Sequence, residues 1–207
     1  QTLEEYAPSI SSVAARLRLL LRICEPVAFA HARGVIHRDL KPSNIMIGRF
    51  GEVWVLDWGL AVTDPAGTTE RGESVAVPAT LKRMTQAGTI LGTPGYRAPE
   101  QEHRSGEITS AVDIFALGAV TAYLLTHRHP DVDASLDLGG VPAPLRAIIR
   151  KACAADPLER YASVLEFAGD LGRYLDGERV LSYDEPWFAT LRRWLERYRF
   201  VIALLAA

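Results

Sequence analysis

The chain has 207 residues, of which 48% are hydrophobic and 23% are charged, as is ordinary for one globular domain with a real core. Its 23 Lys and Arg are matched by 25 Asp and Glu, for a net charge of -2. We therefore expect no nucleic-acid partner, because the basic footprint of such proteins is absent. Cys24 and Cys153 lie far apart in apolar helical patterns, which favours buried free thiols in a reducing cytoplasm over a disulfide.

The first element expected along the chain is one long, half-buried helix. Apolar residues recur at helical spacing over residues 13–28, Ser11 and Ser12 are candidate caps, and Gly34 is a candidate stop. Two short β-rich runs follow, at residues 45–47 and 53–56. They are joined by Gly48, Arg49, Phe50 and Gly51, so the pattern predicts a small hairpin.

A long loop and three further helices are expected after the hairpin. Residues 63–93 are rich in Thr, Gly, Pro and Ser and show little periodicity, which is typical of a functional or disordered loop. Apolar stripes predict helices over residues 109–125, 143–154 and 162–175. The predicted fold class is therefore mostly α with a small β-hairpin, an α+β arrangement.

The last eight residues, 200–207, read FVIALLAA and follow four arginines between residues 192 and 199. This pattern is typical of a positive-inside flank that leads into a membrane helix. A span needs about 20 apolar residues, so the segment is either the start of a truncated transmembrane helix near Phe200 or the apolar end of a surface helix. Because the chain begins with Gln1 and its first methionine is Met46, we expect it to be an internal fragment.

Residues suited to phosphate chemistry gather in three motifs: HRDLKPSN at 37–44, DWG at 57–59 and APE at 98–100. Asp39, Asn44 and Asp57 are expected at the mouth of the hairpin, as hard oxygen ligands of the kind that Mg²⁺ takes beside substrate phosphates. Lys41 adds an ammonium that suits the charge on a transferring phosphoryl group. Each motif alone is a weak signal, since an isolated Asp-x-Gly is usually a turn.

In this order and spacing, the motifs closely resemble the catalytic loop, the metal-binding triplet and the end of the activation segment of eukaryotic-like (Hanks-type) bacterial serine/threonine protein kinases. The resemblance covers about residues 1–175. It is to the large, carboxyl-terminal lobe only, because the Gly-rich loop, strand lysine and helix glutamate of the small lobe do not occur in the sequence. We therefore expect the amino-terminal lobe to be missing and to be this chain's natural partner.

The resemblance implies ATP and Mg²⁺ as cofactors and Ser or Thr hydroxyls of proteins as acceptors. Asp39 is expected to orient the acceptor hydroxyl and take its proton, and Lys41 to steady the transferred phosphate. Asn44 and Asp57 are expected to hold Mg²⁺ and, with Lys41, to contact the nucleotide. Lys41 is typical of the serine/threonine branch, and Thr93 is expected to bond to Asp39 and Lys41 and to form the floor under the acceptor.

Regulation is implied at Arg38, which directly precedes the expected base. In the family an arginine at this place pairs with a phosphate on the activation segment through charge-assisted bidentate bonds. Candidate acceptors in the earlier half of the loop are Thr68, Thr69 and Ser74. Those in the later half, which we take as the possible phosphosites, are Thr80, Thr85 and Thr89.

Structural roles are implied for five further residues. Glu100 and Arg160 are expected to form a buried ion pair that ties the end of the segment to the lobe. Asp113 is expected to anchor the backbone of the catalytic loop from a central helix, and His37 and Gly59 complete their motifs.

Two departures from the family pattern stand out. Trp58 replaces the usual Phe. In the family, the packing of this aromatic residue sets the active and inactive positions of the activation segment, and the larger ring must pack differently against that segment. Residues 130–141 are short, Asp-rich and contain Gly where kinases place an additional helix, so that helix is expected to be reduced or lost.

Two hypotheses of different classes follow. In the first, the parent protein is an active serine/threonine kinase and the isolated lobe is nearly inert, because nothing in it clamps the nucleotide phosphates in line. In the second, the chain is a non-catalytic lobe that binds proteins. A small-molecule phosphotransferase is a weaker third, against which Lys41 and the APE motif argue. The expected organisation is a kinase lobe at 1–176, a basic juxtamembrane linker at 177–199 and a membrane helix from 200, which would tether a cytoplasmic domain to the inner membrane.

Overall fold

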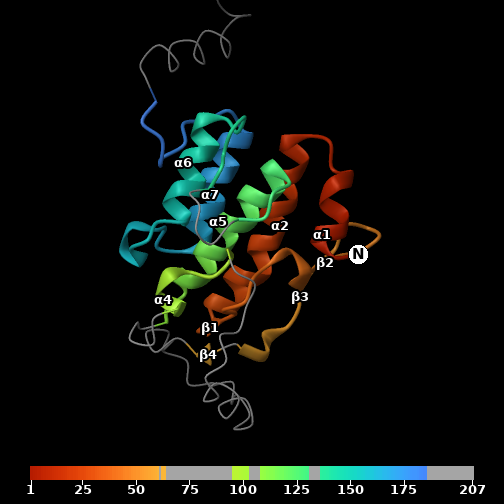
Figure 1. The fold of residues 1–207 in the computed structure, drawn as a ribbon, viewed down its shortest axis with the longest axis vertical. Helices are drawn as coiled ribbons and strands as arrows, with labels where there is room; N and C mark the ends of the chain where they lie inside the picture. The colour runs from red at the N-terminus through yellow and green to blue at the C-terminus, as the bar shows by residue number, and fades with distance from the viewer. Residues whose placement is uncertain (61, 64–94, 103–107, 131–135, 186–207) are drawn as a thin grey trace, which may run out of the picture.

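The computed structural model describes residues 1–60, 62–63, 95–102, 108–130 and 136–185. Four longer helices pack together, and two small antiparallel sheets lie beside them (Figure 1). The predicted fold class, mostly α with a small hairpin, is confirmed.

The helical core is formed by α2 (Val13–His31), α5 (Ala111–Thr126), α6 (Ala143–Ala152) and α7 (Val164–Leu175). Helices α2 and α6 each pack against both α5 and α7. Helix α5 is buried over nearly its whole length, as expected for a helix that is hydrophobic all round. One fully buried side chain from each helix illustrates the shared core: Leu20, Leu117, Ile148 and Phe167.

The helices begin and end close to the predicted residues. Helix α2 starts after Ser12, whose hydroxyl accepts a hydrogen bond from the amide of Ala15 at 3.1 Å, and this is the cap that the sequence suggested. Helix α7 starts two residues later than predicted because Ser163 caps it, by accepting from the amide of Glu166 at 3.2 Å. Helix α5 ends where His127 adopts a left-handed conformation, with a φ of 56°.

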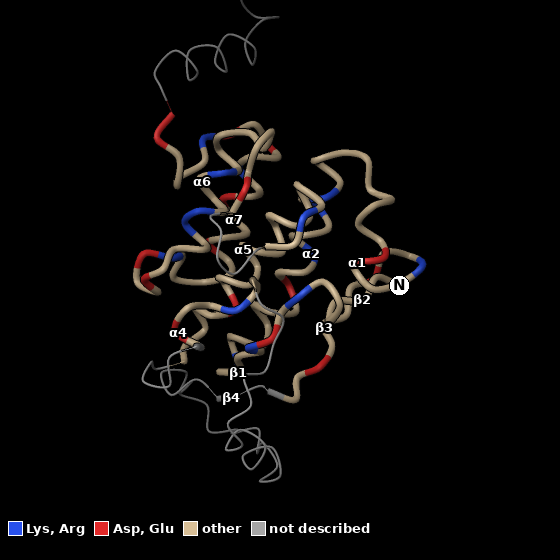
Figure 2. Tube along the Cα trace, viewed as in Figure 1, with Lys and Arg blue, Asp and Glu red and all other residues tan. Residues whose placement is uncertain are grey.

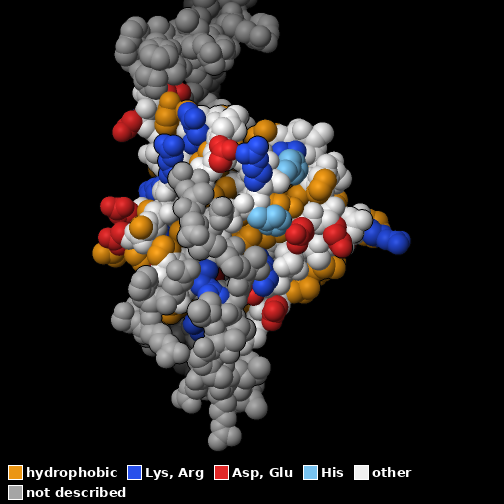
Figure 3. All heavy atoms as spheres, in the orientation of Figure 1, with side chains coloured by type: hydrophobic (Ala, Val, Ile, Leu, Met, Phe, Trp, Pro, Cys, Tyr) orange, Lys and Arg blue, Asp and Glu red, His pale blue; other side chains and the backbone are white. Residues whose placement is uncertain are grey.

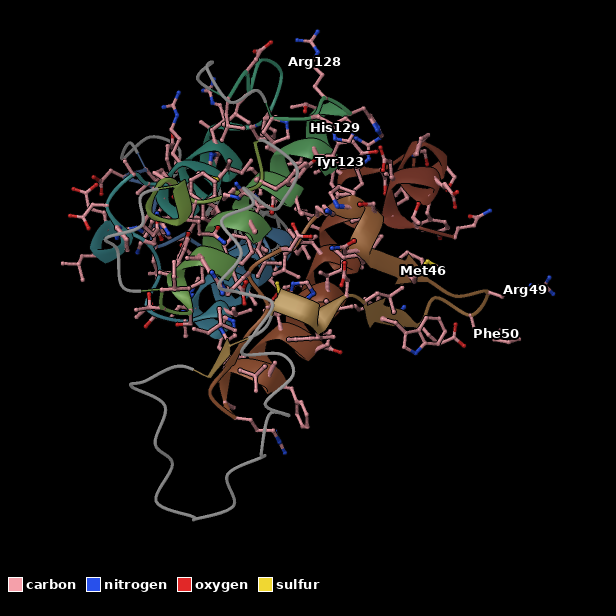
Figure 4. The ribbon with its side chains drawn as sticks, turned by 60° about the horizontal axis from the view of Figure 1, so that its bottom comes forward. Met46, Arg49, Phe50, Tyr123, Arg128 and His129 are labelled. Atoms are coloured by element: carbon pink, nitrogen blue, oxygen red, sulfur yellow. The ribbon has the colours of Figure 1, made fainter. Side chains whose placement is uncertain are left out.

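The predicted hairpin is confirmed. Strands β2 (Ile45–Ile47) and β3 (Val53–Val55) pair antiparallel, with Met46 opposite Trp54. The second strand ends one residue earlier than expected. Arg49 and Phe50 lie at the tip of the hairpin and project away from the body of the molecule (Figure 4).

Several short elements were not predicted. Helix α1 (Leu3–Tyr6) is closed by a capping box between Thr2 and Glu5. Strand β1 (Val35–Ile36) pairs antiparallel with β4 (Val62–Thr63), so the prediction that the long loop begins at residue 63 was wrong. Turns and short helices complete the described chain: η1 (Ala7–Ser9), η2 (Pro42–Asn44), η3 (Trp58–Leu60), α4 (Pro99–Glu102) and η4 (Pro157–Glu159).

Both cysteines are free, as predicted. Among the described residues, no helix is both long enough and apolar enough to cross a bilayer. The segment from Phe200 onward lies outside the described residues, so the expected membrane helix stays a prediction. Residue 130 and residues 136–141, the described parts of the stretch where an additional helix was expected to be reduced, contain no helix.

Candidate active site

Asp39 lies in the loop between β1 and η2, held from two sides by its own loop. The Nζ atom of Lys41 is 2.9 Å from Asp39 Oδ2. The Nδ2 atom of Asn44 donates to the same Oδ2 at 3.1 Å and to the Asp39 carbonyl at 2.9 Å. The side chains of Lys41 and Asp39 are 19% and 12% exposed, so the pair is shielded but still reached by solvent. Within the described part of the chain, Asp39 Oδ1 accepts no hydrogen bond.

Asp57 lies beside this loop because the hairpin closes there. The amide of Leu56 donates to the carbonyl of Asn44 at 2.8 Å. Asp57 is the next residue after Leu56, so this bond holds it close to the catalytic loop. Asp57 has a φ of 63°, and such left-handed non-glycine residues are costly and cluster at functional sites. A Cβ atom at Gly59 would lie 3.3 Å from Asp57 Oδ1, so glycine leaves space beside the exposed carboxylate.

The oxygen atoms at this mouth fit Mg²⁺. Because Nδ2 of Asn44 is committed to Asp39, its amide oxygen Oδ1 is left for a ligand, and Asp57 directly follows the residue whose amide bonds to the Asn44 carbonyl. No cluster of three or more His, Cys, Asp or Glu side chains in the described ranges could hold a metal by itself. Mg²⁺ often takes only one or two protein ligands and fills its shell with water and substrate phosphates, so the pair is sufficient for that role.

Asp113, fully buried in α5, holds the backbone that precedes Asp39. Its Oδ1 accepts from the amide of Arg38 at 2.8 Å, and its Oδ2 accepts from the amide of His37 at 2.8 Å. The Nε2 atom of His31 lies 2.7 Å from the same Oδ2. Arg38 has a φ of 73°, so a carboxylate in the core holds a strained turn in place.

His37 is fully buried and connects the loop to the DWG motif. The amide of Asp39 donates to Nδ1 at 3.2 Å, and Nε2 donates to the carbonyl of Leu56 at 2.8 Å. The imidazole meets Trp58 edge to face, with ring centroids 4.6 Å apart. Trp58 donates from Nε1 to the carbonyl of Val55 at 2.9 Å. A Phe could not make that last bond, so Trp58 ties this motif more firmly to β3.

Glu100 in α4 and Arg160, directly after η4, form a double ion pair. Nη1 lies 2.6 Å from Oε1 and Nη2 lies 2.7 Å from Oε2. The guanidinium is wholly buried and also donates to the carbonyls of Ala154 at 2.8 Å and Ala111 at 2.9 Å. The pair therefore links α4 to the start of α5 and to the end of α6.

Comparison with known proteins agrees with this geometry. Residues 3–137 match the protein kinase domain, which is more than half of the 207-residue chain. The chain belongs to the protein kinase family. Similar proteins include the serine/threonine-protein kinases PknD of Chlamydia caviae, 35% identical over 185 residues, and of Protochlamydia amoebophila, 36% identical over 187 residues. The alignments cover 81% and 80% of this chain but 20% and 19% of those relatives, so the chain spans about a fifth of their length.

The kinase residues expected from the sequence fall into two groups. The structure brings together those of the catalytic loop, the DWG motif, the ion pair and the α5 anchor, through the contacts given above. The others lie outside the described residues: Thr93 and the loop hydroxyls at Thr68, Thr69, Ser74, Thr80, Thr85 and Thr89.

One kinase residue that the sequence analysis missed is Gln101. Its Oε1 accepts from the amide of Ala98 at 2.9 Å, and its Nε2 donates to the carbonyl of Arg38 at 2.9 Å. A single amide thus joins the residues before α4 to the catalytic loop. Its position directly after the APE motif is a signal that could have drawn attention to it.

A second missed feature surrounds His129, just beyond α5. Its Nδ1 lies 2.9 Å from the hydroxyl of Tyr96, and its Nε2 lies 3.3 Å from Oε1 of Glu4 in α1. The ring stacks on Tyr123 with centroids 4.7 Å apart, and Figure 4 shows the two side by side. Burial raises the pKa of Tyr96. Histidine and acidic side chains also lie near one another on the face seen in Figure 3. No short motif could have predicted contacts among three distant segments.

Proposed function

We propose that this kinase lobe belongs to an enzyme that transfers the γ-phosphoryl group of ATP to Ser or Thr hydroxyls of proteins. The observation that carries the proposal is the arrangement at Asp39. One carboxylate oxygen is held by Lys41 and Asn44 at 2.9 and 3.1 Å, and the other, which no described residue contacts through a hydrogen bond or ion pair, is available to the substrate hydroxyl. The printed names of the PknD relatives, serine/threonine-protein kinases, support the choice of acceptor.

In the proposed reaction the side chains of the catalytic loop orient the substrate hydroxyl and balance the charge of the phosphate groups. Asp39 accepts a hydrogen bond from the substrate hydroxyl at Oδ1 and takes its proton as the new oxygen–phosphorus bond forms and the bond to the ADP oxygen breaks. Lys41 stabilises the negative charge on the transferring phosphoryl group. Asn44 and Asp57 would hold Mg²⁺, which when bound would neutralise charge on the nucleotide phosphates.

The proposal also includes the cellular location and the partners of the enzyme. We place the reaction in the cytoplasm, where ATP is available, and propose a membrane tether on the sequence pattern around residue 200 alone. Protein substrates are the expected partners.

The test is phosphate transfer from labelled ATP to dephosphorylated casein, with Mg²⁺, by the longest natural protein that contains this chain. Asp39→Asn is expected to lower the rate by about 10²–10⁴, the usual contribution of a general base. Asp137→Asn is the matched control, because Asp137 is 65% exposed and its contacts, an ion pair with Arg128 and a hydrogen bond from the amide of Gly139, lie outside the site. An undiminished rate in Asp39→Asn would reject Asp39 as the base, and no transfer by the wild-type protein would favour the non-catalytic, protein-binding lobe.

A further inference from the structure

The turn between β2 and β3 presents an aromatic side chain to solvent. Phe50 is 90% exposed, and together with Arg49 it projects away from the body of the molecule (Figure 4). Trp54 in β3 is 51% exposed, and a Cβ atom at Gly48 would lie 2.7 Å from its indole ring. The two aromatic side chains therefore lie at the same end of one hairpin.

The exposure of Phe50 is built into the turn. The amide of Gly48 donates to the carbonyl of Glu52 at 2.9 Å, and the amide of Gly51 donates to the carbonyl of Gly48 at 3.0 Å. The carboxylate of Glu52 accepts from the amide of Phe50 at 3.1 Å. Gly51 has a φ of 83°, which glycine adopts without strain. A turn fixed in this way holds the Phe50 ring in water, although burial of the ring would be favourable.

The charge exposed at this turn is positive. Arg49 is exposed, and Figure 2 shows a basic position at the far end of this loop, apart from the packed helices. Arg22 in α2 lies behind the turn, since a Cβ atom at Gly51 would be 2.7 Å from its Nη1. Glu52 is only half-buried, but its carboxylate is engaged with the amide of Phe50. Guanidinium groups and aromatic rings are thus presented together.

A lipid surface fits these features better than a folded protein partner. A stable protein interface needs about 800 Å² on each partner, with its anchor side chains enclosed in pockets, whereas this turn is narrow and projecting. A bilayer needs no matching pocket, because aromatic rings settle at the level of the headgroups. Arginines beside the rings favour anionic headgroups over neutral ones.

We propose that the hairpin tip, defined as Arg22, Arg49, Phe50 and Trp54, docks on an anionic phospholipid surface. Phe50 enters the interfacial layer, and the arginines contact lipid phosphates. The contact is weak by itself, because only one ring is fully presented. The membrane tether proposed above would keep the tip near lipid at a high effective concentration, so a weak contact is enough to orient the lobe on the membrane.

The first test measures how the full 207-residue chain partitions onto sedimenting vesicles of phosphatidylglycerol and phosphatidylcholine, without ATP. Phe50→Ser is expected to lower the partition coefficient about 10-fold, because the inserted ring is lost. Arg49→Gln should lower it about 5-fold at low salt, and little at high salt or on phosphatidylcholine alone, because the arginine acts through its charge.

Leu158→Ser is the matched control, because Leu158 is 92% exposed but lies in η4, away from the hairpin. It should leave the partition coefficient unchanged. All variants keep the same carboxyl-terminal segment, so the differences among them report on the hairpin tip. If Phe50→Ser partitions like the wild type, or if Leu158→Ser is equally impaired, the proposal is wrong.

A polarity-sensitive dye gives a local reading. It is attached to folded Arg49→Cys or Leu158→Cys, and wild type treated in the same way corrects for the natural thiols. Anionic vesicles should shift the dye emission to the blue at position 49 and not at position 158. A dye at position 49 that stays in water would overturn the proposal.

Sedimentation velocity without lipid distinguishes a protein partner from a membrane. If the wild type self-associates, Phe50→Ser abolishes this association and vesicle binding is the same in both, the tip binds a second copy of the chain and the membrane proposal fails. None of these measurements uses ATP, so their outcome is independent of the proposed catalytic function.

Discussion

Glu100 and Arg160 lie 60 residues apart in the sequence and are joined by two parallel contacts of 2.6 and 2.7 Å. The Arg160 side chain is completely buried, and that of Glu100 is 12% exposed. Because the same guanidinium also donates to three backbone carbonyls, its loss would leave a carboxylate and several carbonyls without their partner.

Arg160→Ala is therefore expected to lower the free energy of unfolding by about 3–5 kcal/mol, as is usual when one partner of a buried ion pair is removed. The matched control is Arg128→Ala, which removes an ion pair whose members are 72% and 65% exposed. That exposed pair should contribute at most about 1 kcal/mol. Urea unfolding followed by circular dichroism measures both, and equal losses in the two variants would contradict a structural role for the buried pair.

A second matched pair tests how tightly the segment before α4 packs. Gly95 and Gly140 both have positive φ, at 91° and 79°. A Cβ atom at Gly95 would overlap the carbonyl oxygen of Pro130, whereas nothing lies within 4 Å of one at Gly140. Gly140→Ala should cost about 1–2 kcal/mol, for the left-handed backbone alone. Gly95→Ala should cost about 1–3 kcal/mol more, because overlap adds to it. Equal costs would mean that the segment moves freely away from Pro130.

The two thiols should be unreactive in the folded chain. Cys24 is 2% exposed, and burial raises its pKa, helped by the charge of Glu25. Burial also raises the pKa of Cys153 to about 12, although Arg160 acts in the opposite direction. Since the thiolate is the reacting form, Ellman's reagent at pH 8 should label neither cysteine in native protein and both in urea. Rapid labelling without denaturant would show that a thiol is accessible.

The longer elements of the fold were predictable because their signals are local. The apolar spacing of residues 13–28 and the Ser12 cap predicted α2, and the two glycines at 48 and 51 predicted the hairpin. The pairing of β1 with β4 was not predictable, because each strand has only two residues and the paired residues lie 26 and 28 positions apart in the sequence. Helix α1 is too short to show a period, although Thr2 and Glu5 carry the spacing of a capping box.

The residues of the site likewise fall into those that local spacing predicts and those that only tertiary packing brings together. Asp39, Lys41 and Asn44 lie within six residues of chain, so their spacing alone brought them together. The contact of Gln101 with the catalytic loop could not be predicted, because this glutamine reaches the carbonyl of Arg38 from 63 residues away. His129 likewise meets Glu4 and Tyr96 only through the packing of three elements. Contacts of this kind are decided by how helices dock, which periodicity does not determine.

Asp170 offers a prediction with a definite dependence on pH. This carboxylate in α7 is 1% exposed and accepts from the amides of Leu181 and Ser182 at 2.9 and 3.0 Å and from the hydroxyl of Tyr161 at 3.0 Å. Burial raises its pKa, but these hydrogen bonds outweigh burial, so the pKa lies below its ordinary value. The ionised carboxylate therefore stabilises the fold of the segment that follows α7.

A depressed pKa gives stability that is present above the unfolded value, about 3.9, and is lost as pH falls through the folded value. At pH 7, Asp170→Asn should be less stable than wild type by about 1.5–3 kcal/mol, since it replaces an ionised acceptor with a neutral amide. The gap should narrow below about pH 4, because the carboxyl of the unfolded wild-type chain is protonated first and that of the folded chain only at lower pH. Asp137→Asn, at an exposed carboxylate, should differ little from wild type at any pH. Urea unfolding at pH 7, 5, 4 and 3 measures the gap, and a gap that stays constant down to pH 3 would show that the ionised form of Asp170 contributes nothing to stability.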